Sequence, residues 1–324
     1  MYNKGVVDTM DELKKLGIDM VTIPLPFRLN HVNCFIAEGE HGYTIIDAGL
    51  HDEAAVQAWD PIVKDRTVHD IIITHIHPDH SGYAGSLQEK TSANVAMTEV
   101  DAKMYEQIWT PSALPKLQRD YELAAVPENI TEDIIDITKN FSPQILPWPK
   151  VNHFLQEGEM IPFGTGEYEV LYTPGHSEGL VVFYNKTDNV LLSTDHILPK
   201  ITPNISYWFY GEANPLQSFE HSLQKIKKLN AELVIPSHGK PFYDANKRID
   251  EIWEHHLERF DMTLDAIKGG ATVFEVCEVL FPFELNTYDY QFAIGEAIAH
   301  LEYLRAKNEC TRTVHQGMWV YEQL

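Results

Sequence analysis

Short apolar runs separated by turn residues characterise the chain up to about residue 245. Runs of this kind, rich in β-branched and aromatic residues, are typical of β-strands. They predict strands at 21–24, 32–37, 43–47, 71–74, 168–172, 180–184, 190–193 and 233–236. Helical spacing of apolar residues predicts helices at 53–65 and 215–229. Strands in runs with interspersed helices indicate a layered α/β or α+β domain.

Residues 105–150 depart from this pattern, because prolines such as Pro111 and Pro127 separate two predicted helices, at about 114–125 and 129–139. Long insertions in compact domains are often functional, so we expect a helical insertion that caps a site. The alternative is a surface excursion without a role.

The apolar pattern changes again from residue 246. An amphipathic helix is followed by two more, and Thr272 with Glu275 resembles a capping box at the start of the second. The tail, 311–321, alternates around Gln316-Gly317 and predicts a β-hairpin. Three helices and a hairpin are winged-helix-like, so we expect one domain over residues 1–245 and a small helical domain over 246–324.

Composition narrows the classes of function. Hydrophobic residues make up 44% of the chain, as in packed globular proteins. The 25 basic and 48 acidic residues leave a formal charge of −23, which disfavours nucleic acid and anionic membranes as partners. Cys34, Cys277 and Cys310 form no CxxC motif, so buried free thiols are expected. Without a signal-like start or a long apolar stretch, we expect a cytoplasmic protein with no membrane contact.

The strongest chemical signal is the segment THIHPDH at residues 74–80, in the loop that follows the predicted strand 71–74. It holds four candidate metal ligands within six residues: His75, His77, Asp79 and His80. Neutral imidazole and carboxylate groups suit Zn²⁺, and also Mn²⁺ or Fe. Because such a cluster is costly to bury without a metal, a polar loop that is His-rich by chance is the weaker alternative.

This HxHxDH pattern after an apolar strand resembles that of the metallo-β-lactamase-fold hydrolases. Three further motifs follow in the order found in that family: TPGHS at 173–177, STDH at 193–196 and PSHG at 236–239. Each motif ends a predicted strand, and the resemblance spans about residues 20–245. It implies an α+β fold, the four-layer αββα sandwich, with the helical insertion and the winged-helix-like domain added to it.

The resemblance also implies a centre of two divalent metal ions, with Zn²⁺ as the first expectation and Mn²⁺ or Fe as alternatives. Its ligand sets would be His75, His77 and His176 for one ion, and Asp79, His80 and His238 for the other, with Asp195 between them. A metal-bound hydroxide would attack a small-molecule substrate. Asp79 and Asp195 are the carboxylates that we expect to serve in catalysis.

Variations within the motifs indicate which branch of the metallo-β-lactamase-fold family the chain resembles. The commonest true β-lactamases of this fold have Cys at the bridging position, whereas Asp195 resembles glyoxalase II, lactonases and ribonucleases. We therefore expect hydrolysis of a small thioester, ester or lactone. The alternative is a metal-dependent endoribonuclease or phosphodiesterase of the same fold, but residues 246–324 hold seven basic and fourteen acidic residues, which disfavours it. A non-enzymatic binding module is a third hypothesis, and a homodimer is compatible with any of them.

Four other polar residues lie near these motifs. By resemblance, Asp47 would orient the ligand loops, and a turn-stabilising role is the alternative. His196 is either a donor to substrate or a structural histidine. Tyr207 and Tyr210 are either part of a substrate wall or core residues, and their hydroxyls can polarise a carbonyl.

Overall fold

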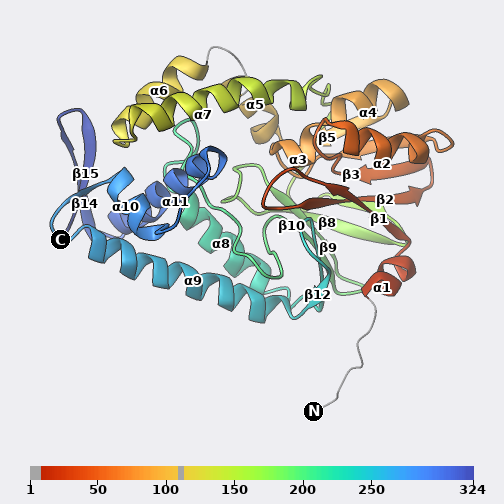
Figure 1. Cartoon of the computed structure of the whole chain (residues 1–324). Helices are drawn as coiled ribbons and strands as arrows, with labels where there is room; N and C mark the ends of the chain where they lie inside the picture. Colours follow the sequence, from red (N-terminus) through yellow and green to blue (C-terminus); the bar gives the residue numbers. More distant parts are fainter. Residues whose placement is uncertain (1–8, 109–112) are drawn as a thin grey trace.

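The computed structural model describes residues 9–108 and 113–324 (Figure 1). Pro111, which belongs to the predicted insertion, lies outside the described residues. Within the described part, two six-stranded sheets stack face to face and a three-stranded sheet lies near the C-terminus. The chain begins its described part with α1 (Thr9–Lys15), which leads into the first sheet.

The first sheet has the order β1 (Ile18–Pro24), β2 (His31–Gly39), β3 (Gly42–Ile46), β4 (Val68–Ile72), β5 (Asn94–Met97) and β6 (His153–Phe154). Strands β1 to β3 pair antiparallel, whereas β3 to β6 pair parallel. The carboxyl ends of β3, β4 and β5 therefore meet at one edge of the sheet.

The second sheet has the order β12 (Phe242–Tyr243), β11 (Leu233–Pro236), β10 (Val190–Thr194), β9 (Val181–Asn185), β8 (Gly166–Tyr172) and β7 (Met160–Phe163). Strands β10 and β11 are parallel, and β9 runs antiparallel to both β8 and β10. The carboxyl ends of β8, β10 and β11 therefore also share an edge. The predicted strands exist in both sheets, and β5, β6, β7 and β12 were not predicted, because they are short or carry a polar pattern.

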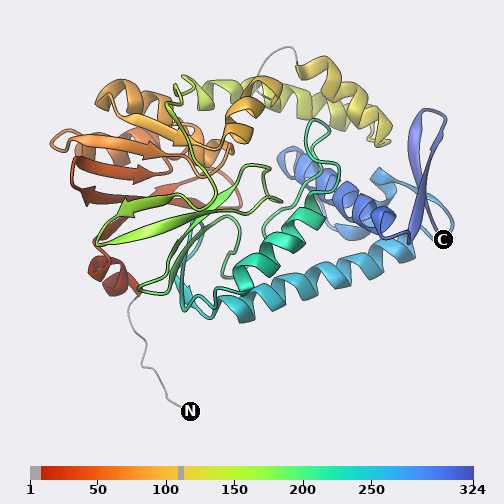
Figure 2. The same cartoon turned by 180° about the vertical axis from the view of Figure 1, so that it is seen from behind.

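Buried apolar side chains hold the layers together. Phe35 and Ile46 of the first sheet meet Tyr168 and Phe183 of the second in the core between them. Helices α2 (Glu53–Val63) and α4 (Ala84–Thr91) cover the outer face of the first sheet, and α8 (Pro215–Lys227) covers that of the second (Figures 1 and 2). This is the expected αββα sandwich. Full burial of one such side chain stabilises the fold by about 1.5–3 kcal/mol.

Within the predicted range 105–150 the insertion contains α6 (Leu114–Leu123), α7 (Glu128–Phe141) and the short 3₁₀ helix η2 (Ser142–Ile145), and the structure extends it back to residue 99 by α5 (Glu99–Ile108). The predictions of α6 and α7 are confirmed, whereas α5 was missed because its sequence is largely polar. Buried Tyr121 and Ile134 place α6 and α7 in the same apolar cluster as the C-terminal helices. The insertion thus bridges the sandwich and the C-terminal region (Figure 2).

The C-terminal region contains α9 (Ala245–Ala266), α10 (Val273–Leu280), α11 (Thr287–Ala306) and a hairpin of β14 (Cys310–His315) and β15 (Met318–Gln323), to which β13 (Ala271–Thr272) adds a third strand. The capping box of Thr272 and Glu275 is present. Helix α11 is longer than its apolar pattern indicated, because it is buried among α7, α8, α9 and α10 and so has no polar face along much of its length.

Two further expectations concern single features of the chain. Cys34, Cys277 and Cys310 are buried and free, as predicted. Among the described helices, none combines the length and the apolar character that a membrane span requires.

A buried carboxylate joins α11 to the hairpin. Glu302 is 2% exposed and accepts hydrogen bonds from Arg305, from Arg312 at 2.8 Å and from the Tyr321 hydroxyl at 2.5 Å. A buried charge is tolerated only when it is paired and hydrogen-bonded, and these three donors meet that requirement.

We expect Glu302→Ala to lower the free energy of unfolding by about 2–3 kcal/mol, since it leaves buried donors without an acceptor. Urea unfolding followed by tryptophan fluorescence measures the loss. Glu309→Ala, at an exposed position directly before β14, is the matched control and should change the free energy of unfolding by less than about 0.5 kcal/mol. Equal stability of the two variants would contradict this role of Glu302.

Candidate metal centre

Seven side chains from the ends of four strands converge at the edge shared by the two sheets. They are the seven that the motifs named: His75, His77, Asp79, His80, His176, Asp195 and His238. His75 and His77 follow β4, and His80 lies in the short helix α3 (Pro78–Ser81). In the described part of the chain their ligand atoms form three overlapping groups, each within 4.8 Å, that could hold a metal ion.

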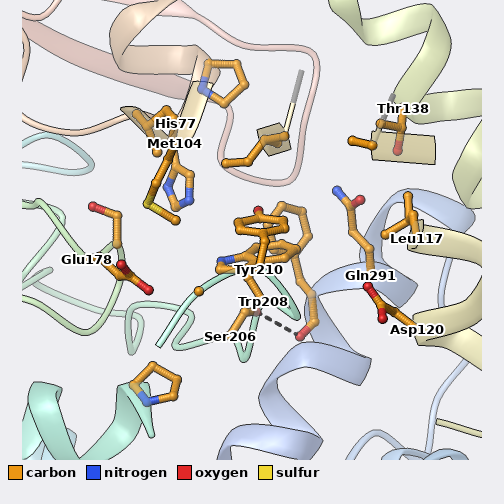
Figure 3. Close-up of a pocket in the computed structure, with 18 of the residues that line it drawn as sticks. His77, Met104, Leu117, Asp120, Thr138, Glu178, Ser206, Trp208, Tyr210 and Gln291 are labelled. Carbon is orange, nitrogen blue, oxygen red and sulfur yellow. Dashed lines mark hydrogen bonds between the residues drawn. The ribbon is translucent and has the colours of Figure 1, made fainter. Parts of the chain in front are cut away.

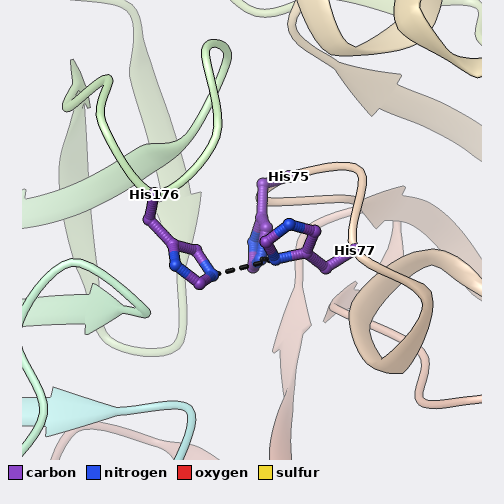
Figure 4. A group of neighbouring side chains, drawn as sticks. All are labelled: His75, His77 and His176. Carbon is purple, nitrogen blue, oxygen red and sulfur yellow. Dashed lines mark hydrogen bonds between the residues drawn. The ribbon is translucent and has the colours of Figure 1, made fainter. Parts of the chain in front are cut away.

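One of these groups consists of three imidazoles (Figure 4). The Nδ1 atom of His77 lies 3.0 Å from Nε2 of His75 and 2.9 Å from Nε2 of His176. A tetrahedral zinc ion with Zn–N bonds of ~2.1 Å separates its ligand nitrogens by ~3.4 Å. Outward movements of a few tenths of an ångström, about the tolerance of such sites, would therefore admit one ion.

The second group surrounds two carboxylates. Asp79 Oδ2 lies 3.6 Å from Nε2 of His80 and 3.4 Å from Nε2 of His238. Asp195 lies between the two groups, with its carboxylate oxygens 3.5 Å from His80 Nε2, 3.4 Å from His176 Nε2 and 3.3 Å from His238 Nε2. These separations exceed hydrogen-bond distance and match those of atoms that share a cation.

Several buried polar atoms in this cluster have no hydrogen-bond partner. They include Nε2 of His80, Nε2 of His238 and Oδ1 of Asp195. A buried polar atom without a partner costs about 1–3 kcal/mol. Because the three atoms face one another, a bound cation would satisfy all of them, so the residues present fit a metal centre.

The opposite ring nitrogens fix the tautomers of four histidines. The Nδ1–H groups of His80, His176 and His238 donate to Asp47 Oδ2 at 2.7 Å, Asn204 O at 2.7 Å and His31 O at 2.6 Å, and that of His75 to Thr74 Oγ1 at 3.0 Å. With a cation bound, each Nε2 would therefore direct its lone pair into the cluster. Partners of this kind are typical of metal-binding histidines.

Burial and charge set the protonation states. Burial, with neighbouring imidazoles, lowers the pKa of His75 well below its usual value and that of His77 to about 3. Burial opposes ionisation of Asp79, yet His80 and His238 hold its pKa at about 2. Burial likewise opposes protonation of His238, but Asp195 and Asp79 raise its pKa to about 10. The carboxylates thus stay ionised and favour added positive charge in the cluster.

The backbone around the ligands is constrained. Asp47 has φ +61°, in the left-handed region, and its carboxylate accepts 2.9 Å hydrogen bonds from both N and Oγ1 of Thr74. Gly175 has φ +140°, and a Cβ there would lie 2.5 Å from Cβ of Phe219. The left-handed backbone at Asp47 accompanies the contacts of its carboxylate with Thr74 and His80, and Gly175 lets the loop of His176 pack closely on Phe219.

Sequence reasoning missed Asp101, which lies on α5. Its buried carboxylate accepts hydrogen bonds from Ile76 N at 2.8 Å, Gly179 N at 2.7 Å and Ser177 Oγ at 3.0 Å. It thereby ties the loop of His75 and His77 to the loop of His176. Burial raises the pKa of Asp101 to about 6, so the group is ionised and accepts all three bonds at neutral pH. Its position just after a strand end was the signal available.

Asn204 was also missed, and it connects the centre to the C-terminal region. Its carbonyl accepts from His176, and its side-chain amide donates to Glu296 Oε2 of α11 at 3.0 Å. The Ser206 hydroxyl donates to Asn204 Oδ1 at 2.5 Å. Helix α11 thus fixes the residue that orients a ligand histidine.

The remaining candidates occupy different surroundings. Tyr210 lines a pocket next to His77, whereas the ring of Tyr207 packs against Phe209 and Trp319 outside it. His196 packs edge-on against Phe219, and burial lowers its pKa to about 3. His256, which belongs to none of the motifs, is buried with its Nδ1 3.2 Å from Nε2 of His300.

We expect Asp101→Ala to lower the free energy of unfolding by about 2–3 kcal/mol, because two backbone N–H groups and a hydroxyl lose their acceptor in a buried place. Chemical denaturation of the metal-free protein measures this effect. Asp101→Asn, which keeps one acceptor oxygen, should fall between the wild type and Ala. Glu99→Ala, which changes an exposed residue on the same helix, is the control. An equally large loss of stability in that variant would contradict the role of Asp101 in joining the two ligand loops.

Comparison with known proteins shows which family the chain resembles along its length. Residues 28–238 match the metallo-beta-lactamase superfamily, and residues 260–324 match the metallo-beta-lactamase-like C-terminal domain. A probable metallo-hydrolase of Bacillus subtilis is 23% identical over 93% of this chain and 96% of its own length. A hydroxyacylglutathione hydrolase of Cereibacter sphaeroides is 25% identical over 69% of this chain and 70% of its own.

Solved structures agree with these relatives in fold. The crystal structure of a metallo-beta-lactamase family protein from Thermus thermophilus superposes with a TM-score of 0.83 at 29% identity, covering 95% of this chain and 99% of that one. The similarity therefore covers both the sandwich and the C-terminal region. The chain belongs to the metallo-β-lactamase superfamily of metal-dependent hydrolases.

Proposed function

We propose that this protein is a dinuclear metal hydrolase that cleaves a small thioester, ester or lactone. The observation that carries the proposal is the convergence of buried lone pairs from the two sheet edges, with the outer nitrogens of four histidines fixed by acceptors. Neutral imidazoles and ionised carboxylates are the forms that bind divalent cations.

The geometry supports one assignment of the ligands. His75, His77 and His176 would hold one ion, Asp79, His80 and His238 the other, and Asp195 would lie between the two. Zn²⁺ suits this set, and Mn²⁺ or Fe are the alternatives. When bound, such ions polarise a substrate carbonyl and lower the pKa of water from about 15.7 to about 7.

The protein's own residues have distinct tasks in this mechanism. The carboxylate of Asp195 would offset the repulsion between the two cations. Asp79 would bind its ion through Oδ2, and its second carboxylate oxygen could then accept a proton from water and return it to the leaving group. Asp47 orients His80, and the carbonyls of Asn204 and His31 orient His176 and His238.

Two observations support a small acyl substrate. The hydroxyacylglutathione hydrolase that resembles this chain acts, by its name, on a thioester. The endoribonuclease alternative would need a basic surface, whereas residues 246–324 carry twice as many acidic as basic residues. The cytoplasmic location, the boundary between residues 245 and 246 and a homodimer stay predictions.

We expect Asp195→Ala to lose metal and activity together, because it removes the anion between two cations. Metal content by mass spectrometry should fall, and kcat/KM on a cleaved thioester should drop more than about 100-fold, beyond the range typical of outer partners. The control is Asp65→Ala, which removes an exposed carboxylate away from the metal centre and should change neither metal content nor activity. Retention of both ions and of activity in Asp195→Ala would refute the assignment.

We expect the metal-loaded protein to hydrolyse at least one member of a panel of short thioesters, esters and lactones, with loss of the activity on chelation and recovery on adding metal. Release of thiol or acid is measured, with labelled single-stranded RNA assayed in parallel. Two bound ions without turnover of any panel member, or preferential and salt-dependent cleavage of the RNA, would contradict the acyl assignment.

A further inference from the structure

A large pocket adjoins the metal centre. Its inner end is formed by Ile76, His77 and His176, and its empty space, including the open mouth, is about 1270 Å³. The walls come from the insertion helices, the loop 206–212 and α11, and Figure 3 shows several of the side chains that point into it. Because the lining extends from His77 to Leu117 of α6 and Phe292 of α11, the pocket can accommodate a molecule larger than an acetyl group.

Aromatic and aliphatic side chains dominate these walls. Trp208 stacks on Tyr210 with ring centroids 6.0 Å apart and an interplanar angle of 6°, and it meets Phe292 edge-on at 6.0 Å. Leu117 of α6 lies on the opposite wall from the sandwich, and Met104 of α5 lies near His77 (Figure 3). Such a lining favours burial of apolar surface over polar contacts.

The charges in the pocket disfavour an anion. Among the described lining residues, Lys116 is the one Lys or Arg, and it is paired with Asp120 at 2.7 Å and with the carbonyl of Phe209. Glu178 and Glu212 line the same pocket and bring two further carboxyl groups to it. Away from the metal centre, a carboxylate or phosphate on a substrate chain would therefore meet negative charge without an unpaired lysine or arginine.

We propose that this pocket binds an uncharged apolar acyl or aryl chain, so that the preferred substrate is an apolar thioester or ester rather than one with an anionic acyl chain. This inference rests on the proposed hydrolase function. The chain lies along Trp208 and Leu117, and the acyl carbon lies at the His77 end. Hydrolysis joins a water oxygen to that carbon and breaks its bond to sulfur or oxygen. The leaving group departs with the electron pair and takes up a proton.

A chain-length series tests the proposal on the metal-loaded protein. We expect kcat/KM for N-acetylcysteamine thioesters to rise about two- to fourfold per methylene from acetyl to hexanoyl. Burial of one methylene group favours binding by a factor of about this size. The adipoyl thioester, which has the length of hexanoyl and a terminal carboxylate, should react at least tenfold more slowly than hexanoyl. A flat series, or preference for adipoyl, overturns the proposal.

Two variants locate the effect. In Trp208→Ala and Leu117→Ala the ratio of hexanoyl to acetyl kcat/KM should fall at least about threefold, since the chain loses its wall contacts. Leu257→Ala, at a 49% exposed position on α9 away from the pocket, is the matched Leu control and should keep the wild-type ratio. An unchanged ratio in both pocket variants overturns the placement.

A binding measurement separates this inference from the proposed function. The ketone 2-octanone has an apolar chain and no leaving group, so calorimetry follows its binding even if the protein cleaves no ester. We expect it to bind the wild type and Leu257→Ala equally and Trp208→Ala at least tenfold more weakly, with no binding of the dianion suberate. No turnover of esters together with this binding pattern would refute the hydrolase and keep the apolar pocket. Equal binding to all three proteins would refute the pocket.

Discussion

The structure depends on holding seven ligand atoms close together in a buried space where they have few other partners. Imidazole lone pairs and carboxylate oxygens that face one another repel, so their arrangement must be imposed from outside the cluster. The ends of β4, β8, β10 and β11 supply the positions, because parallel strands deliver their carboxyl ends to one edge of each sheet. The acceptors behind the histidines then fix the direction of each lone pair.

These outer acceptors come from parts of the chain that are distant in sequence. Asp47 follows β3, Asp101 belongs to the insertion, and Asn204 is held by Glu296 of α11. The insertion and the C-terminal region are therefore structural components of the centre as well as neighbours of it. Loss of the packing between α7 and α11 would disturb His176 through Asn204 before it disturbed the strands themselves.

The strands and the cluster of His75, His77, Asp79 and His80 were predicted from local signals in the sequence. The four-layer arrangement and the assignment of His176, Asp195 and His238 followed from the resemblance of the motifs to those of a known family. Apolar runs mark strands, and a polar cluster directly after a run marks a strand end. Asp101 and Asn204 gave no comparable signal, since each is a single polar residue whose partners in the ligand loops lie at least 25 residues away in sequence. Helix α11 was underestimated because burial on several sides removes the amphipathic period, and α5 because its sequence is polar. The character of the pocket followed only from the contacts among distant segments.

The walls of the pocket and the seven metal-facing residues lie mostly on different segments. Trp208, Leu117 and Phe292 are supplied by a loop, the insertion and α11, whereas the metal-facing side chains other than His77 and His176 lie away from the walls. Evolution can therefore exchange the walls and keep the chemistry. Differences in substrate among related proteins at 23–29% identity are then to be sought in the insertion, the loop and α11, and a common reaction in the metal-facing residues.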